Sequence, residues 1–91
     1  MKIYVLVETR VEWTSNEVDT TIQGFTDAKE AERAYKQSYN EAMESPDIFD
    51  HEARNSYKNE IIQDSHYYVD YDEGSNVGEV HLTGELKVME V

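Results

Sequence analysis

The stretch "KIYVLVETRVEW", residues 2–13, shapes the interpretation of the whole chain, because its residues alternate between two distinct sets. One set is rich in β-branched residues, and the other mixes charged residues with two large apolar ones. The first set contains Ile3, Val5, Val7, Thr9, Val11 and Trp13, and the second contains Lys2, Tyr4, Leu6, Glu8, Arg10 and Glu12. A period of two over this length predicts a long, half-buried β-strand. The valine-rich set is expected to face the core.

A second strand follows at once. The segment "TSN", residues 14–16, consists of residues whose side chains bond their own backbone in turns. Val18, Thr20 and Ile22 then alternate with polar residues as far as Gly24-Phe25. The short connection between two alternating segments predicts a β-hairpin.

The next segment has the spacing of a helix. Thr26 or Asp27 can cap its N-terminus, and Asp27 with Glu30 has capping-box spacing. The apolar stripe has small residues at most positions, which would let the helix lie close to a sheet. The stripe contains Ala28, Ala31, Tyr35, Ser38 and Ala42.

A second helix is predicted from Ser45 to about Gln63. Ser45 before Pro46 fits an N-cap followed by the first helical position, where the fixed φ of proline is favourable. An apolar residue then recurs every four positions, as on one side of a helix. These residues are Phe49, Ala53, Tyr57 and Ile61.

Two further strands complete the chain. In residues 65–72, Tyr67, Val69 and Tyr71 are expected to face the helices, and the alternate residues to point away. "DEGSN", residues 72–76, is a turn, and an alternating segment follows it with Gly84 at its middle. A glycine inside a strand indicates a bulge or the close approach of a helix.

The expected fold is a single α+β domain over residues 1–91 with the element order ββααββ. The simplest packing is a four-stranded antiparallel sheet with both helices on one face. Placing the two long strands, first and last, in the centre gives the strand order 2-1-4-3.

The composition restricts the function. The chain has 91 residues with 20 acidic and 8 basic ones, a net charge of −12, and no cysteine. The absence of cysteine excludes thiol catalysis and cysteine-ligated zinc. The negative charge disfavours direct contact with nucleic acid or anionic membrane. It favours a protein partner with a basic surface. The absence of a long apolar segment leads us to expect a soluble, cytoplasmic protein.

No catalytic and no cofactor-binding residue is predicted. The four glycines are scattered, so no phosphate-binding loop is formed, and no serine lies in a Gly-x-Ser-x-Gly turn. His51-Glu52 lacks the second histidine of a zinc-protease helix, because Asn55 stands there. The segment "DYDEGSN" imitates a calcium loop but has its glycine one position early and His81 where a glutamate is required. An enzyme is therefore not expected.

The metal-site alternative involves His66, His81 and Asp70. Because side chains alternate between the two faces of a strand, both histidines are expected on the face away from the helices, on strands that pair with each other. If the register sets them opposite, a divalent metal could bind between them. Two exposed surface histidines are the plainer interpretation, so no metal is assigned.

Partner binding is expected on the sheet face that the helices leave uncovered. Aromatic and aliphatic residues surrounded by charged ones are typical of a modest protein interface. The predicted partner-binding residues are Tyr4, Leu6, Tyr68, Asp70, Asp72, Glu73 and Glu85.

The N-terminal part also resembles a known type of protein. Tyr4 to Thr9 form a "YVLVET" strand, Gly24-Phe25 end the second strand, and Lys29 to Ala34 open the helix. Over residues 3–42 this resembles small, uncharacterised proteins of phages and mobile elements, with an N-terminal β-hairpin followed by a capped "K-E-x-A-E-x-A" helix. The resemblance implies an accessory protein that works by binding, and it implies no catalytic residue.

The expected function is thus that of a small acidic protein–protein interaction module of phage or mobile-element type, acting without catalysis. One form of it is a nucleic-acid mimic that inhibits a basic nuclease or DNA-binding protein. The alternatives are a homo-oligomeric scaffold, in the simplest case a homodimer joined through the open sheet face, and a small metal-dependent enzyme.

Overall fold

The computed structural model describes residues 1–54, 65–74 and 78–91 of the chain. The described residues form two strands, then a helix, then three further strands. They are β1 (Lys2–Glu12), β2 (Glu17–Phe25), α1 (Ala28–Ala42), β3 (Ile48–Arg54), β4 (Ser65–Asp72) and β5 (Glu79–Glu90).

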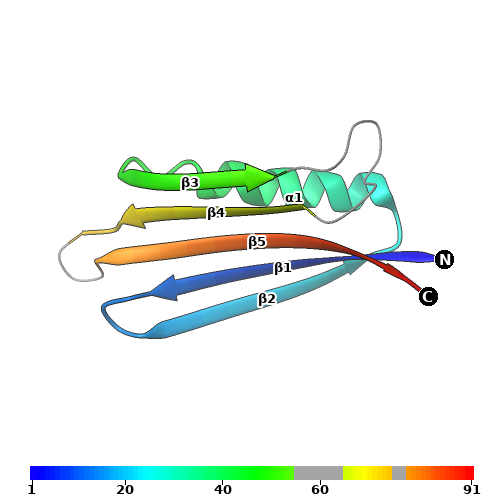
Figure 1. Cartoon of the computed structure of the whole chain (residues 1–91), viewed down its shortest axis with the longest axis horizontal. Coiled ribbons are helices and arrows are strands. Elements are labelled where there is room, and N and C mark those ends of the chain that lie inside the picture. The colour runs from blue at the N-terminus through cyan, green and yellow to red at the C-terminus, as the bar shows by residue number, and fades with distance from the viewer. Residues whose placement is uncertain (55–64, 75–77) are drawn as a thin grey trace.

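The five strands form one antiparallel sheet in the order β2-β1-β5-β4-β3 (Figure 1). The two longest strands, β1 and β5, lie side by side in the middle and pair from Lys2 opposite Glu90 to Glu12 opposite Val80. Both termini therefore meet at one end of the sheet, where the Met1 amino group donates to the Val91 carbonyl over 3.1 Å. α1 packs on one face, mainly over β1 and β5.

The predicted four-stranded sheet with two helices is wrong, because the described segments contain five strands and one helix. Residues 48–54 of the expected Ser45–Gln63 helix form β3, which pairs with the free edge of β4. Backbone groups on that edge need hydrogen-bond partners, and this requirement outweighs a four-residue apolar spacing. Phe49, expected on the buried stripe, is 59% exposed beside a bulge. The rest of the expected helix, residues 55–63, lies outside the described residues.

The predicted first helix is confirmed. Asp27 is its N-cap, and the Asp27 carboxylate accepts the backbone N–H of Lys29 over 2.9 Å. This contact satisfies one of the backbone donors that a helix start leaves open. The expected stripe is buried at its last four positions, which are Ala31, Tyr35, Ser38 and Ala42.

The core lies between α1 and the facing side of the sheet, and it reverses the expected orientation of β1. Tyr4 and Leu6 are 8% and 1% exposed, so both were wrongly assigned to an exposed partner-binding face. Leu6 lies opposite Leu86, and Tyr4 lies opposite Val88. Cross-strand neighbours share a face, so the buried side chains of β5 place Tyr4 and Leu6 under the helix.

The ring of Tyr67, and not a bulge or the close approach of α1, explains why residue 84 is a glycine. The β4–β5 register is continuous and sets Gly84 opposite Tyr67. A Cβ at Gly84 would come within 1.9 Å of the Tyr67 ring, so the ring covers the glycine backbone. The same ring makes edge-to-face contacts with Tyr35 and Tyr39, at centroid distances of 5.8 and 5.6 Å.

Candidate functional site

The sheet face opposite α1, called the open face from here on, is covered by no described element. It divides into two parts. The apolar strip lies on β1 and β2 and consists of Val5, Val7, Val11, Val18 and Ile22. The acidic patch lies on β3, β4 and the start of β5 and consists of Asp50, Glu52, Asp70, Asp72 and Glu79.

The acidic patch contains two pairs of carboxylates in directly opposed positions. Asp50 lies opposite Asp70 across β3 and β4, and Asp72 lies opposite Glu79 across β4 and β5. Side chains in directly opposed positions have Cβ atoms about 5 Å apart, and like charges there destabilise a sheet. The patch is therefore a place where the fold tolerates repulsion.

Tyr68 and His81 sit within this patch. The two rings stack with centroids 5.7 Å apart and an interplanar angle of 26°. His81 Nδ1 hydrogen-bonds the Asp70 carboxylate, and the Tyr68 hydroxyl donates to Asp50 over 3.2 Å. The pKa of Tyr68 is raised, first by loss of solvent and then by its bond to Asp50 and the negative charges around it, including Glu52. The ring pair thus lies in a negative local field.

The residues of the metal-site alternative are not brought together as one ligand set. The register places His66 opposite Glu85 and His81 opposite Asp70, so the two histidines do not face each other. Both line a shallow hollow of about 370 Å³ on the open face, beside Thr83. Among residues 1–54, 65–74 and 78–91, no three His, Asp or Glu side chains converge as a metal ion requires.

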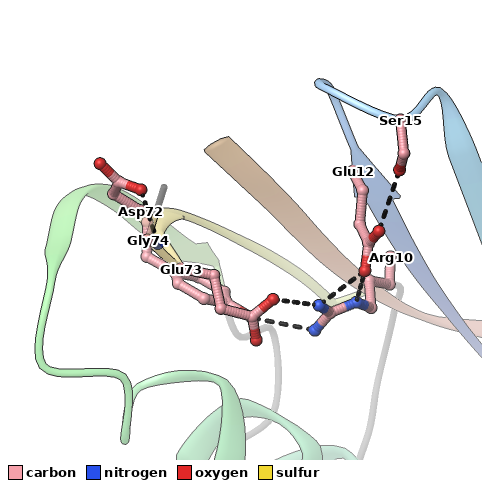
Figure 2. A network of polar contacts seen from close by, with 7 residues as sticks. Arg10, Glu12, Ser15, Asp72, Glu73 and Gly74 are labelled. Atoms are coloured by element: carbon pink, nitrogen blue, oxygen red, sulfur yellow. Dashed lines mark hydrogen bonds and ion pairs between the residues drawn. The ribbon is translucent and has the colours of Figure 1, made fainter. Parts of the chain in front are cut away.

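Glu73 takes part in a charged network on the helix side of the sheet (Figure 2). Arg10 donates to Glu73 over 2.5 Å, to Glu12 over 2.9 Å and to the Tyr71 hydroxyl over 2.9 Å. The adjacent turn is fixed by Asp72, whose carboxylate accepts the Gly74 N–H over 2.9 Å. Arg10 therefore links β1 to the turn that follows β4.

The network also changes the acidity of its members. Burial acts to lower the pKa of the Arg10 guanidinium, but its hydrogen bonds to Glu12 and Glu73 outweigh that effect and raise the pKa above its ordinary value. The hydrogen bond from Arg10 is the main reason why the pKa of Glu12 is lowered. Glu73, predicted to contact a partner, is thus engaged within the chain.

A groove of about 340 Å³ lies beside this network, between α1 and the sheet. In it the Ser38 hydroxyl donates to Glu8 over 2.7 Å and lies 2.5 Å from the Tyr67 hydroxyl. Burial raises the pKa of Tyr67 even though the Ser38 contact acts in the opposite direction. Ser38 is 6% exposed, and its bonds to Glu8 and Tyr67 hold α1 against β1 and β4.

The predicted partner-binding residues therefore fall into three groups. Tyr4 and Leu6 belong to the core, and Glu73 binds Arg10. The remaining ones lie on the open face, as strand parity predicted. They are Tyr68, Asp70, Asp72 and Glu85.

Three acids of the patch were missed. Asp50 and Glu52 fell in the segment expected to be a helix, and Glu79, which lies opposite Asp72, was not among the predicted partner-binding residues. A pattern in the sequence could have indicated the strand that contains Asp50 and Glu52. Charged residues stand at every second position, at Asp50, Glu52 and Arg54, as on one face of a strand.

No helix in the part of the chain that the structure describes is long and apolar enough to cross a membrane. No family model, no curated protein and no solved structure matches the chain.

Proposed function

We propose that this protein is a binding module whose acidic patch takes the basic surface of a protein partner. The observation that carries the proposal is the presence of two pairs of directly opposed carboxylates, Asp50 with Asp70 and Asp72 with Glu79. Each such pair destabilises the isolated sheet by roughly 0.2–1 kcal/mol. A cation placed between the two carboxylates would convert this repulsion into attraction.

The geometry of the patch favours several spaced cations over a single metal ion. Neighbouring acids on one strand, such as Asp50 and Glu52, are about 6.6 Å apart along it, because alternate residues share a face. A metal ion needs ligands that converge within about 2.5 Å of one point. Lysine and arginine side chains on a protein surface can instead occupy separate positions along the row.

The aromatic pair within the patch favours arginine among these cations. Tyr68 and His81 present stacked rings, of which Tyr68 bonds Asp50 and His81 bonds Asp70. A guanidinium group can lie flat on an aromatic face and bond a neighbouring carboxylate at the same time. The net charge of −12 adds long-range attraction, which increases the rate of association with a basic surface.

The test uses an arginine-rich peptide and two variants of equal net charge. The patch variant carries Asp50→Asn and Glu79→Gln, and the control carries Glu30→Gln and Glu44→Gln, both on exposed positions away from the open face. We expect the patch variant to bind several-fold more weakly than the control by isothermal titration calorimetry. We also expect the affinity of the unaltered protein to fall steeply as salt is raised.

Equal losses of affinity for the peptide in the two variants would contradict the proposal, because binding would then depend on net charge alone. Chemical shift changes give a second reading of the same experiment. Changes on Tyr68 and His81 upon peptide addition support the patch, whereas changes confined to α1 contradict it.

A narrower form of the proposal is that the patch imitates a nucleic acid and occupies the groove of a DNA-binding protein. It is supported by the high negative charge and by acids arranged in rows on a flat face. The narrower form predicts that the protein displaces duplex DNA from a basic DNA-binding domain, and that the patch variant does so less well. Binding to such a domain without displacement would restrict the function to the broader form.

A further inference from the structure

The two edges of the sheet differ in how they are protected. β3, at one edge, has seven residues, follows Pro46 closely, and has a register irregularity between Ile48 and Asp50. Short length, proline and bulges are the usual means by which an edge strand avoids pairing with another chain. β2, at the other edge, has nine residues that pair with β1 without interruption from Glu17 to Phe25. It contains no proline, lysine or arginine.

We propose that the free edge of β2 pairs antiparallel with β2 of a second copy of this chain. The two-fold axis would be perpendicular to the sheet and would pass beside Thr20. Such an axis joins two five-stranded sheets into one sheet of ten strands, with the α1 helices of the two copies on the same side. The proposal is independent of the acidic patch, which lies on the other half of each sheet.

The charges on β2 select this register. With Thr20 opposite its own copy, Asp19 lies opposite Thr21 and Glu17 lies opposite Gln23, so each acid meets a neutral side chain that can donate a hydrogen bond. An axis one residue earlier would set Asp19 against Asp19. An axis two residues earlier, at Val18, would set Glu17 against Asp19.

The apolar residues select the same register. On the open face Val18 would lie opposite Ile22 of the other copy, and this pair would occur twice, once on each side of the two-fold axis along the strands. These side chains are 62% and 69% exposed in the single chain. An axis one residue later, at Thr21, would set Val18 against Gly24 and lose both apolar contacts. The Thr20 register therefore satisfies charge and apolar contact together.

The helices leave room for this pairing. Strands in a sheet are about 4.8 Å apart, so the two copies of β1 would lie about 14 Å from each other. α1 lies mainly over β1 and β5, and a helix with its side chains is about 10–12 Å across. The second copy can therefore approach the edge without contact between the helices. The two apolar strips become continuous across the new sheet.

The first experiment measures the molar mass by size-exclusion chromatography with light scattering. We expect the unaltered chain to be a dimer, and Ile22→Lys to be a monomer with an unchanged circular dichroism spectrum. The matched control is Phe49→Lys, which places the same residue at an exposed apolar position on the other edge, and it should remain a dimer. A monomeric unaltered chain at near-millimolar concentration overturns the proposal.

The second experiment tests the register with spin labels, which the absence of cysteine in the chain makes simple. Single cysteines at positions 18, 20 and 22 are labelled in three separate proteins. We expect the shortest distance between copies at position 20, and equal, longer distances at 18 and 22, because each is displaced by about 13 Å along the strands. Unequal distances at 18 and 22, or the shortest distance elsewhere than 20, overturn the Thr20 register.

Discussion

The two faces of the sheet differ in how their charged groups are treated. On the face under α1, Glu8 accepts a bond from Ser38, and Arg10 is shared among Glu12, Glu73 and Tyr71. The face under α1 also has two opposed carboxylates, Glu12 and Glu17, but Glu12 is ion-paired with Arg10. On the open face, by contrast, the opposed pairs Asp50–Asp70 and Asp72–Glu79 have no lysine or arginine partner among the described residues. The comparison teaches that one face accounts for the stability of the fold, while the other retains groups that stability alone would not select.

The largest expected effect compares Leu6 with its neighbour Val7. Leu6 is 1% exposed under α1, whereas Val7 lies on the open face. We expect Leu6→Ala to lower the free energy of unfolding by about 2–5 kcal/mol, because it leaves a cavity in the core. Val7→Ala should cost less than about 1 kcal/mol, a difference of strand propensity. Urea denaturation of both variants measures the contrast, and equal losses would show that the two faces are buried alike.

An intermediate effect compares two glycines on opposite faces. A Cβ at Gly84 meets the Tyr67 ring, whereas a Cβ at Gly24 meets no atom within 4 Å. Gly84→Ala should therefore destabilise the protein by about 1–3 kcal/mol through overpacking, and Gly24→Ala should not. In a protein that already carries Tyr67→Leu, Gly84→Ala should lower the free energy of unfolding by less than it does in the unaltered protein. Thermal unfolding measures both, and a tolerated Gly84→Ala would contradict the proposed role of the ring.

The smallest expected effect tests the repulsion within the acidic patch. Glu79→Gln removes one carboxylate from the pair with Asp72, so it should raise the free energy of unfolding by roughly 0.2–1 kcal/mol. High salt should reduce the gain, because the repulsion is screened. Glu85→Gln on the same strand makes the same change in net charge, but Glu85 lies opposite His66 and Val7. A similar gain in both variants would assign the effect to net charge.

The alternation of side chains gave the correct buried face for β4, where the set Tyr67, Val69 and Tyr71 is clearly more apolar than the set that points away. Tyr67, Val69 and Tyr71 are buried under α1, and the helix stripe ending at Ala42 is buried with them. Both segments owe their pattern to local geometry, which a single sequence records directly.

Parity could not decide which face of β1 is buried. Both of its sets contain large apolar residues, and the valine-rich set has more of them. The choice is made by the cross-strand contacts of Leu6 with Leu86, which join the two ends of the chain. For the same reason β3 was predicted as a helix: its hydrogen bonds to β4 are tertiary contacts, which local spacing does not contain.

The central position of β1 and β5 has a consequence for how the chain folds. Lys2 pairs with Glu90, so the middle of the sheet is closed only when the last strand is available. Pairing between segments so distant in sequence requires a large loss of chain entropy before any contact forms, which makes folding slow. During synthesis the β1–β2 hairpin would have to wait for β5 with Tyr4 and Leu6 exposed, and we expect this to be the state most prone to aggregate.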